Sequence, residues 1–152
     1  MSFKNIDIDS ITLKKFNKSW LLNQPINIKT PKLYIPFGLE KYYQNYILKL
    51  QLRDIKNNKE LTEFQDFIER LEKKLSDLLN LEVPTQLYYS EKYDPILSTK
   101  LLQKNDKFTC NAFKNKQPFS IFDIEKGTYC KCNITIDSIW LFKGKYYYKI
   151  KV

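Results

Sequence analysis

The chain has 152 residues, a formal net charge of +9 and a hydrophobic fraction of 43%, which are typical of a single folded domain. It contains no histidine, three cysteines and three isolated glycines, so it offers no histidine-dependent catalytic site and no glycine-rich phosphate loop. No apolar run approaches the roughly 20 residues of a membrane-spanning helix. We therefore expect an intracellular, non-enzymatic protein with no cofactor, no bound metal and no membrane partner.

The positive charge lies on the two flanks of the chain and favours a polyanionic partner. Residues 1–57 carry a net charge of +6, residues 58–80 carry −2, and residues 81–152 carry +5. We therefore expect a basic binding surface to be built from the flanks and not from the middle segment.

The first flank is predicted to form strands. Alternation within residues 3–16 indicates an opening strand, and the prolines in residues 24–37 indicate an irregular extended segment with edge-strand pieces such as 26–28. Residues 42–55 are ambiguous, and we interpret them as a strand. Its inward side chains would be Tyr46, Leu48, Leu50 and Leu52. Its outward side chains would be Asn45, Lys49, Gln51 and Arg53.

The middle segment, residues 58–81, is predicted to be a helix. Asn57 or Asn58 can act as its N-cap, and Pro84 prevents its continuation. Apolar residues recur at three- and four-residue spacing, which is typical of a helix that packs on the sheet of its own domain. A helix that binds a partner is the alternative.

The last flank is predicted to contain short strands at 86–89, 96–102 and 107–113, a turn at 123–127 and a terminal hairpin that turns at 143–144. Residues 128–142 alternate as one long strand. Its inward set is Cys130, Cys132, Ile134, Ile136, Ser138 and Trp140. Its outward set is Tyr129, Lys131, Asn133, Thr135 and Asp137. We expect the two cysteines to be small buried side chains, reduced and without metal.

The final strand interleaves lysines and tyrosines. Lys145, Tyr147, Lys149 and Lys151 fall on one face by period two. Such a face can neutralise phosphates and stack bases, as in proteins that bind single-stranded nucleic acids. The alternative is a solvated hairpin whose lysines only prevent aggregation.

The element order predicts a mostly β fold with one long inserted helix. Strands surround a single helix at about 58–81, which suggests that residues 1–152 form one OB-like closed barrel with the helix at one end. An antiparallel sandwich is the main alternative.

Three segments of the last flank resemble the C-terminal half of a protein family that is found in nucleocytoplasmic large DNA viruses. They are 93–101, which opens with Tyr-Asp-Pro, 122–132, with a Lys-Gly turn before Tyr-Cys-Lys-Cys, and 139–146, with Ile-Trp closed by Gly-Lys-Tyr. That family is similar to the podovirus-type phage single-stranded DNA-binding proteins, which have an OB barrel with a helix between the third and fourth strands. The chain differs in having Ser138, Tyr147 and Tyr148 where the family often has Gly, Gly and Trp. The sequence shows no acidic tail like the one by which the phage proteins recruit replication partners, so we do not expect recruitment of that kind.

The resemblance implies a sequence-nonspecific single-stranded DNA-binding protein that acts in replication, recombination or repair, in the host cytoplasm or a viral factory. RNA as the ligand and the oligomeric state are left open. The residues expected to contact phosphates are Lys49, Arg53, Lys131, Lys145, Lys149 and Lys151. Those expected to stack bases are Tyr129 and Tyr147. The alternative is a non-enzymatic virion or capsid-associated structural protein on the same barrel, with viral replication or virion proteins as partners.

Overall fold

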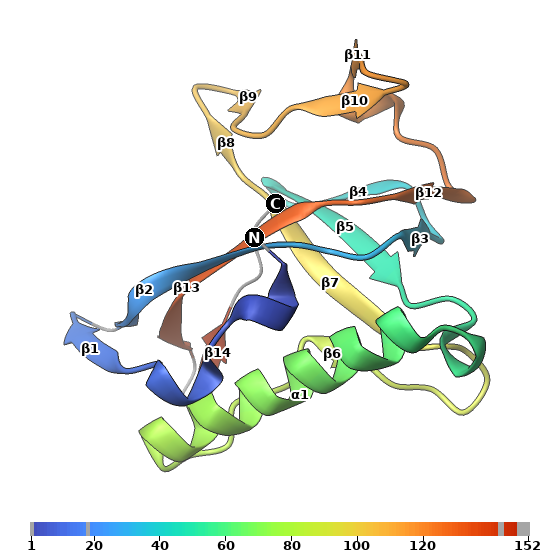
Figure 1. The fold of residues 1–152 in the computed structure, drawn as a ribbon. Coiled ribbons are helices and arrows are strands. Elements are labelled where there is room, and N and C mark those ends of the chain that lie inside the picture. The colour runs from blue at the N-terminus through green and yellow to red at the C-terminus, as the bar shows by residue number, and fades with distance from the viewer. Residues whose placement is uncertain (1, 18, 143–144, 149–152) are drawn as a thin grey trace.

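The computed structural model describes residues 2–17, 19–142 and 145–148, with side chains up to Ile139 (Figure 1). Within this part of the chain, strands dominate and α1 (Lys59–Leu79) is the one α-helix, which confirms a mostly β fold with a single long helix. Figure 1 shows α1 lying beneath the strands and covering one side of them.

The first sheet joins the two ends of the described chain. Its order is β1 (Leu13–Phe16), β2 (Ser19–Lys29), β13 (Asn133–Phe142) and β14 (Lys145–Tyr148), with antiparallel neighbours throughout. In the central pair, Ile134 lies opposite Ile28 and Ile136 lies opposite Ile26, and all four side chains are buried. The pairing of β13 with β14 confirms the predicted terminal hairpin.

The second sheet has six strands. Its order is β12-β3-β5-β7-β6, and β4 also pairs with β5. The bounds are Thr128–Cys130 for β12, Leu33–Ile35 for β3, Leu39–Tyr42 for β4, Asn45–Gln51 for β5, Leu87–Tyr88 for β6 and Ile96–Leu101 for β7. Leu48, Leu50 and Leu52 are buried, as predicted for the inward face. The strand is shorter than the predicted 42–55, and Gln51, which was expected to point outward, is buried as well.

The two sheets meet where the chain passes from β12 to β13. There Thr30 N donates to Cys132 O (2.8 Å), and Cys132 N donates to Thr30 Oγ1 (2.9 Å). These bonds continue the antiparallel pairing where the strand ladders stop. No sheet formed by the described residues closes into a barrel.

Between β7 and β12 the chain forms an arm of two small hairpins, which we call the arm (residues 103–119). One hairpin pairs β8 (Gln103–Lys104) with β9 (Lys107–Phe108), and the other pairs β10 (Ala112–Lys114) with β11 (Gln117–Phe119). The two residues of each turn, Asn105–Asp106 and Asn115–Lys116, have positive φ, as a two-residue type I′ turn requires. Figure 1 shows the arm standing away from the two sheets at the top of the view.

Helix α1 matches its prediction because its ends carry clear sequence signals. Asn58 is the N-cap, and its Oδ1 accepts a hydrogen bond from Leu61 N (3.1 Å). Asn80 ends the helix in the left-handed conformation at φ 53°. The buried face packs on the N-terminal segment, where the Phe3 ring meets the Phe64 ring at 5.2 Å between centroids. The side chains of this face are Leu61, Phe64, Phe67, Ile68, Leu71 and Leu75.

The predicted opening strand at 3–16 is wrong in its first part. Residues Phe3–Asn5 and Ile8–Ser10 are 3₁₀ turns, and only Leu13–Phe16 is a strand. The buried side chains there are Phe3, Ile8 and Ile11, whose spacing follows the contact with α1 and not the period of a strand.

The predicted edge pieces within 24–37 are also wrong for β2. This eleven-residue strand pairs on both sides, with β1 and with β13. Pro25 is tolerated because β13 pairs with Leu21 and then with Ile26, so the register shift leaves Pro25 outside the ladder.

The single long strand predicted at 128–142 is two strands that belong to different sheets. In addition, the register shift between Ile136 and Ser138 moves the buried position to Ile139, which is 0% exposed. The alternation that was expected to place Trp140 inward therefore does not continue past Ile136. The side chain of Trp140 lies outside the described residues.

Candidate nucleic-acid-binding surface

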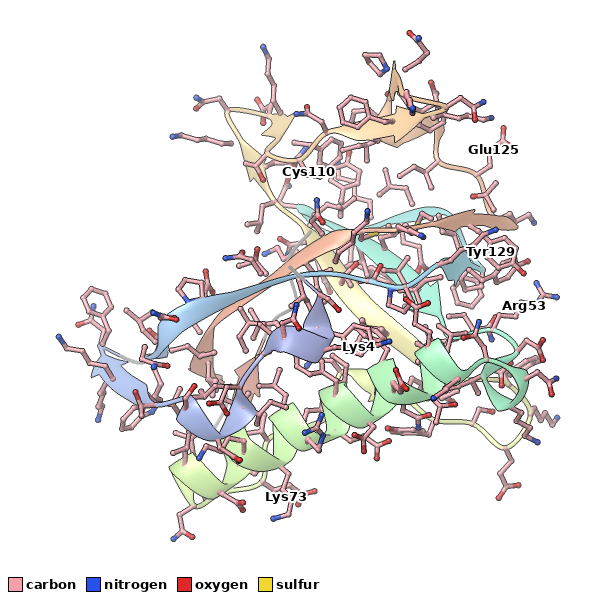
Figure 2. All side chains as sticks on the ribbon, in the orientation of Figure 1. Lys4, Arg53, Lys73, Cys110, Glu125 and Tyr129 are labelled. Carbon is pink, nitrogen blue, oxygen red and sulfur yellow. The ribbon has the colours of Figure 1, made fainter. Side chains whose placement is uncertain are left out.

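Two tyrosines and two basic side chains lie in line on the outer surface of β12, β3 and the end of β5. The Arg53 guanidinium carbon is 4.1 Å from the centre of the Tyr34 ring, and the Tyr34 and Tyr129 ring centres are 5.1 Å apart. The Lys32 ammonium is 5.1 Å from the centre of the Tyr129 ring. We call these four side chains the stacked row because each contacts the next; the ring planes of Tyr34 and Tyr129 are tilted by 58° and are not parallel. Figure 2 shows Tyr129 and Arg53 near each other on one side of the molecule.

Strand register brings the stacked row together. Tyr129 lies directly opposite Tyr34, and Tyr34 lies opposite Gln51. Lys32 precedes Tyr34 by two residues, so period two places both side chains on one face. Arg53 lies in the turn after β5, and its guanidinium group reaches the Tyr34 ring from there. The alternate residues Leu33 and Ile35 are buried and fix that face outward.

A short turn fixes the end of β5 beside the row. Asp54 has φ 63°, which ends the extended chain directly after Arg53. Its backbone N–H donates to the Asp94 carboxylate (2.8 Å), so the segment before β7 holds this turn. The backbone that carries Arg53 is therefore anchored, while its guanidinium group remains exposed.

The surface around the stacked row is open and positively charged. Tyr129 is 51% exposed, and Lys32, Arg53 and Lys131 are exposed. Among the residues that the structure describes, none of these three cations forms an ion pair with a carboxylate. Their charge is thus free to neutralise an anion, and cations on tyrosine faces are a known stabilising arrangement.

Lys49, expected to contact phosphate, lies in a different setting on β5. Its ammonium is 3.6 Å from Glu40 Oε1 and rests over the Phe37 and Tyr42 rings at 5.5 and 5.9 Å. Tyr42 Oη donates to the other Glu40 oxygen at 3.2 Å. Glu40 therefore neutralises Lys49, and the fold does not place Lys49 as a free cation.

The remaining expected residues fall into two separate regions. Lys131 follows Tyr129 beside the row, just before β13 begins. Lys145 and Tyr147 lie in β14, which pairs with the far end of β13. The ten residues of β13 span about 30 Å at about 3.3 Å per residue, so the two regions are not one compact site. Lys149 and Lys151 lie outside the described residues.

Sequence reasoning missed Tyr34 and Lys32. Both lie in the proline-rich segment that was taken as irregular, although Leu33, Tyr34 and Ile35 alternate as a strand does. That alternation was a usable signal for an outward Tyr34. The pairing of Tyr34 with Tyr129, 95 residues away, had no such signal.

The two neighbouring cysteines face away from the stacked row, as their alternation with Tyr129 predicted. Cys132 is buried and Cys130 is half-buried, and their sulfur atoms are 3.5 Å apart. Within the described part of the chain, no group of three or more His, Cys, Asp or Glu side chains is placed to hold a metal ion.

Among the described residues, no helix is both long and apolar enough to cross a membrane. Comparison of the chain with protein-family models, with curated protein sequences and with solved structures gives no match.

Proposed function

We propose that the protein binds single-stranded DNA without sequence preference and serves replication, recombination or repair in a large DNA virus, without enzymatic activity. The stacked row carries this proposal. It offers two adjacent aromatic rings with a cation at each end on an exposed strand surface. Single-stranded DNA presents the matching groups, which are flat bases joined by regularly spaced phosphates.

The row suggests how a strand would bind. A base that stacks on Tyr129 displaces the Lys32 ammonium from the ring, and that flexible side chain then reaches an adjacent phosphate. Arg53 and Lys131 neutralise phosphates on either side, since both are exposed and without a carboxylate partner among the described residues. Every base has a π face, so this mode of binding is tolerant of sequence.

The arrangement of strands supports a related proposal about fold type. We regard the two larger antiparallel sheets together as an incompletely closed OB barrel, in which α1 is inserted between β5 and β7. OB folds are partly open Greek-key barrels that bind oligonucleotides on a strand face. The stacked row lies on such a strand face, where β3 is flanked by β12 and β5.

The proposal predicts a specific salt dependence. Binding to oligothymidine, measured by fluorescence anisotropy, should weaken linearly in log affinity against log salt, by about 0.7 per phosphate neutralised. Replacing Lys32, Arg53 and Lys131 together by Gln should flatten this slope by about two. The reason is that three fewer cations then release counterions when the strand binds.

A matched control separates a local surface from overall charge. Replacing Lys59, Arg70 and Lys73 by Gln also removes two lysines and one arginine, but from the exposed face of α1. This variant should keep the parent slope. Equal effects of the two triple variants would mean that only the net charge matters, and the proposed surface would be wrong.

A second candidate function, a structural protein of the virion, is favoured by one observation. Tyr88, Tyr89 and Tyr93 are exposed around the loop between β6 and β7, where Glu91, Lys92 and Asp94 give a net charge of −1. An aromatic surface without excess positive charge suits a protein contact better than DNA. Concentration-dependent association that Tyr88→Ser and Tyr93→Ser abolish, with no oligothymidine binding, would support this candidate over the first.

A further inference from the structure

All three cysteines of the chain line one cavity. This cavity, of about 860 Å³, lies between the arm and the inner side of the sheet where β3 and β12 meet, and its other walls include Ile35, Leu48 and Leu101. Figure 2 shows Cys110 above the sheet on the arm side. Tyr129 of the stacked row and Cys130 are adjacent on β12, and both line this cavity.

Two of the three thiols are already paired. Cys130 Sγ and Cys132 Sγ are 3.5 Å apart in a hydrogen bond, and Cys110 takes no part in it. Cys132 is buried, and its backbone is held in place by both hydrogen bonds with Thr30. Both thiols of this pair line the cavity, and Cys130, which is half-buried, is the more accessible of the two to a small molecule.

The geometry permits a bond between these sulfur atoms. Residues two apart in an extended chain have Cα atoms about 6.6 Å apart at about 3.3 Å per residue, inside the range of about 4.4–6.8 Å that disulfides span. Closing the sulfur separation from 3.5 Å to a bond of about 2.05 Å also brings the two Cβ atoms to about 3.5–4.5 Å, so it requires a local backbone adjustment at Lys131, between β12 and β13, together with side-chain rotation.

The hydrogen bond also distinguishes the two thiols chemically. It lowers the pKa of Cys130, because the Cys132 thiol stabilises a Cys130 thiolate. The same hydrogen bond, with burial, raises the pKa of Cys132. Thiolates are the reactive form in exchange with disulfides, so Cys130 is the nucleophile and Cys132 the second, resolving thiol.

We propose that Cys130 and Cys132 form a thiol–disulfide exchange site that accepts low-molecular-weight disulfides of the glutathione type. The Cys130 thiolate attacks one sulfur of the disulfide, forms a mixed disulfide and releases one thiolate, which takes up a proton. Cys132 then loses its proton and attacks Cys130 Sγ, which releases the second thiol. In sum, two protein thiols become one disulfide, and the small disulfide is reduced to two thiols. This site does not depend on the proposed function.

The sequence permits a direct test, because the three cysteines fall on three tryptic peptides, residues 108–114, 127–131 and 132–143. The native protein is incubated with increasing glutathione disulfide, its free thiols are blocked by alkylation, and the digest is analysed by mass spectrometry without reduction. We expect the 127–131 and 132–143 peptides to become joined, or to appear as one uncut peptide that has lost two hydrogens. Cys110 should stay alkylated until the concentration is about tenfold higher, because only the pair closes intramolecularly.

Single variants test the two roles. In Cys132→Ser the reaction should stop at Cys130 carrying one glutathionyl group, whereas Cys130→Ser should leave Cys132 unmodified because it is buried. Cys110→Ser should behave as the parent does. The proposal is overturned if the unsubstituted protein links Cys110 to Cys130, forms only intermolecular disulfides, or keeps both thiols alkylated at concentrations that modify Cys110. These results come from the parent chain, so they hold even if a variant does not fold.

Discussion

At the scale of single residues, Tyr129 and Tyr34 are the side chains on which the proposed function depends. Tyr129→Ala should weaken oligothymidine binding by about 1–3 kcal/mol and leave the salt slope unchanged, because stacking releases no counterions. Tyr34→Ala should have an effect of similar size, since Tyr34 supports Tyr129 at 5.1 Å and carries Arg53 on its ring. Fluorescence anisotropy at several salt concentrations measures both quantities.

Tyr43→Ala is the matched control for these two variants. Tyr43 is 95% exposed, so its removal costs little packing, and it lies outside the stacked row. A loss of affinity in Tyr43→Ala equal to that in Tyr129→Ala would show that the protein uses exposed aromatic residues generally, which would contradict a local site at the row.

At the scale of elements, the ends of α1 give a prediction about stability. Asn58→Ala should lower the free energy of unfolding by about 1 kcal/mol, because the Leu61 N–H then loses its hydrogen bond to Asn58 Oδ1. Asn58→Asp should retain most of the stability. Urea unfolding followed by circular dichroism measures the change, and the denaturant slope should stay constant.

Asn57 serves as the control because sequence reasoning could not choose between it and Asn58. Its side chain donates to the Asp54 carboxylate (2.8 Å) on the surface and does not cap the helix. Asn57→Ala should therefore cost clearly less than Asn58→Ala. If Asn57→Ala is the more damaging variant, the cap has been assigned to the wrong residue.

The same scale shows what the sequence could and could not predict. Helix α1 was predictable because its cap and its apolar spacing are local signals. Strand β5 was predictable because Leu48, Leu50 and Leu52 alternate with polar side chains. The 3₁₀ turns near Phe3 and the register shift at Ile136 were not predictable, because each depends on contact with an element far away in the sequence. That element is α1 for the turns and β2 for the register shift. In the candidate site, Arg53, Tyr129 and Lys131 were found, whereas their meeting with Tyr34 depends on pairing between segments far apart in the sequence.

At the scale of the whole molecule, strands of the two basic flanks pair with each other, and the negatively charged middle segment forms α1. The stacked row takes Lys32, Tyr34 and Arg53 from the first flank and Tyr129 from the last. The contact between flanks is held chiefly by the pairing of β2 with β13. The core of that pairing is therefore the sensitive point of the whole fold.

Ile136→Ala tests this dependence. Ile136 is 0% exposed and lies opposite Ile26, so removing its side chain beyond Cβ should cost about 2–5 kcal/mol of unfolding free energy. Thr135→Ala, on the exposed face of the same strand, removes only a hydrogen bond to Asn27 and should cost about 1 kcal/mol or less. Thermal or urea unfolding that gives equal losses for both would contradict the assignment of the buried face of β13.

The pairing of β2 with β13 also has a consequence for how the protein is made. The last residue of β13, Phe142, leaves the ribosome 113 residues after Lys29 ends β2. At about 5–20 residues per second, β2 waits about 6–23 s for its principal partner. During that interval the apolar side chains Leu22, Ile26 and Ile28 lack the neighbouring strand that buries them. The unpaired edge of β2 can then pair with strands of other nascent chains. The yield of folded protein should therefore rise when fewer chains are synthesised at the same time, and the gain should be lost in a permuted chain in which β13 is synthesised directly before β2.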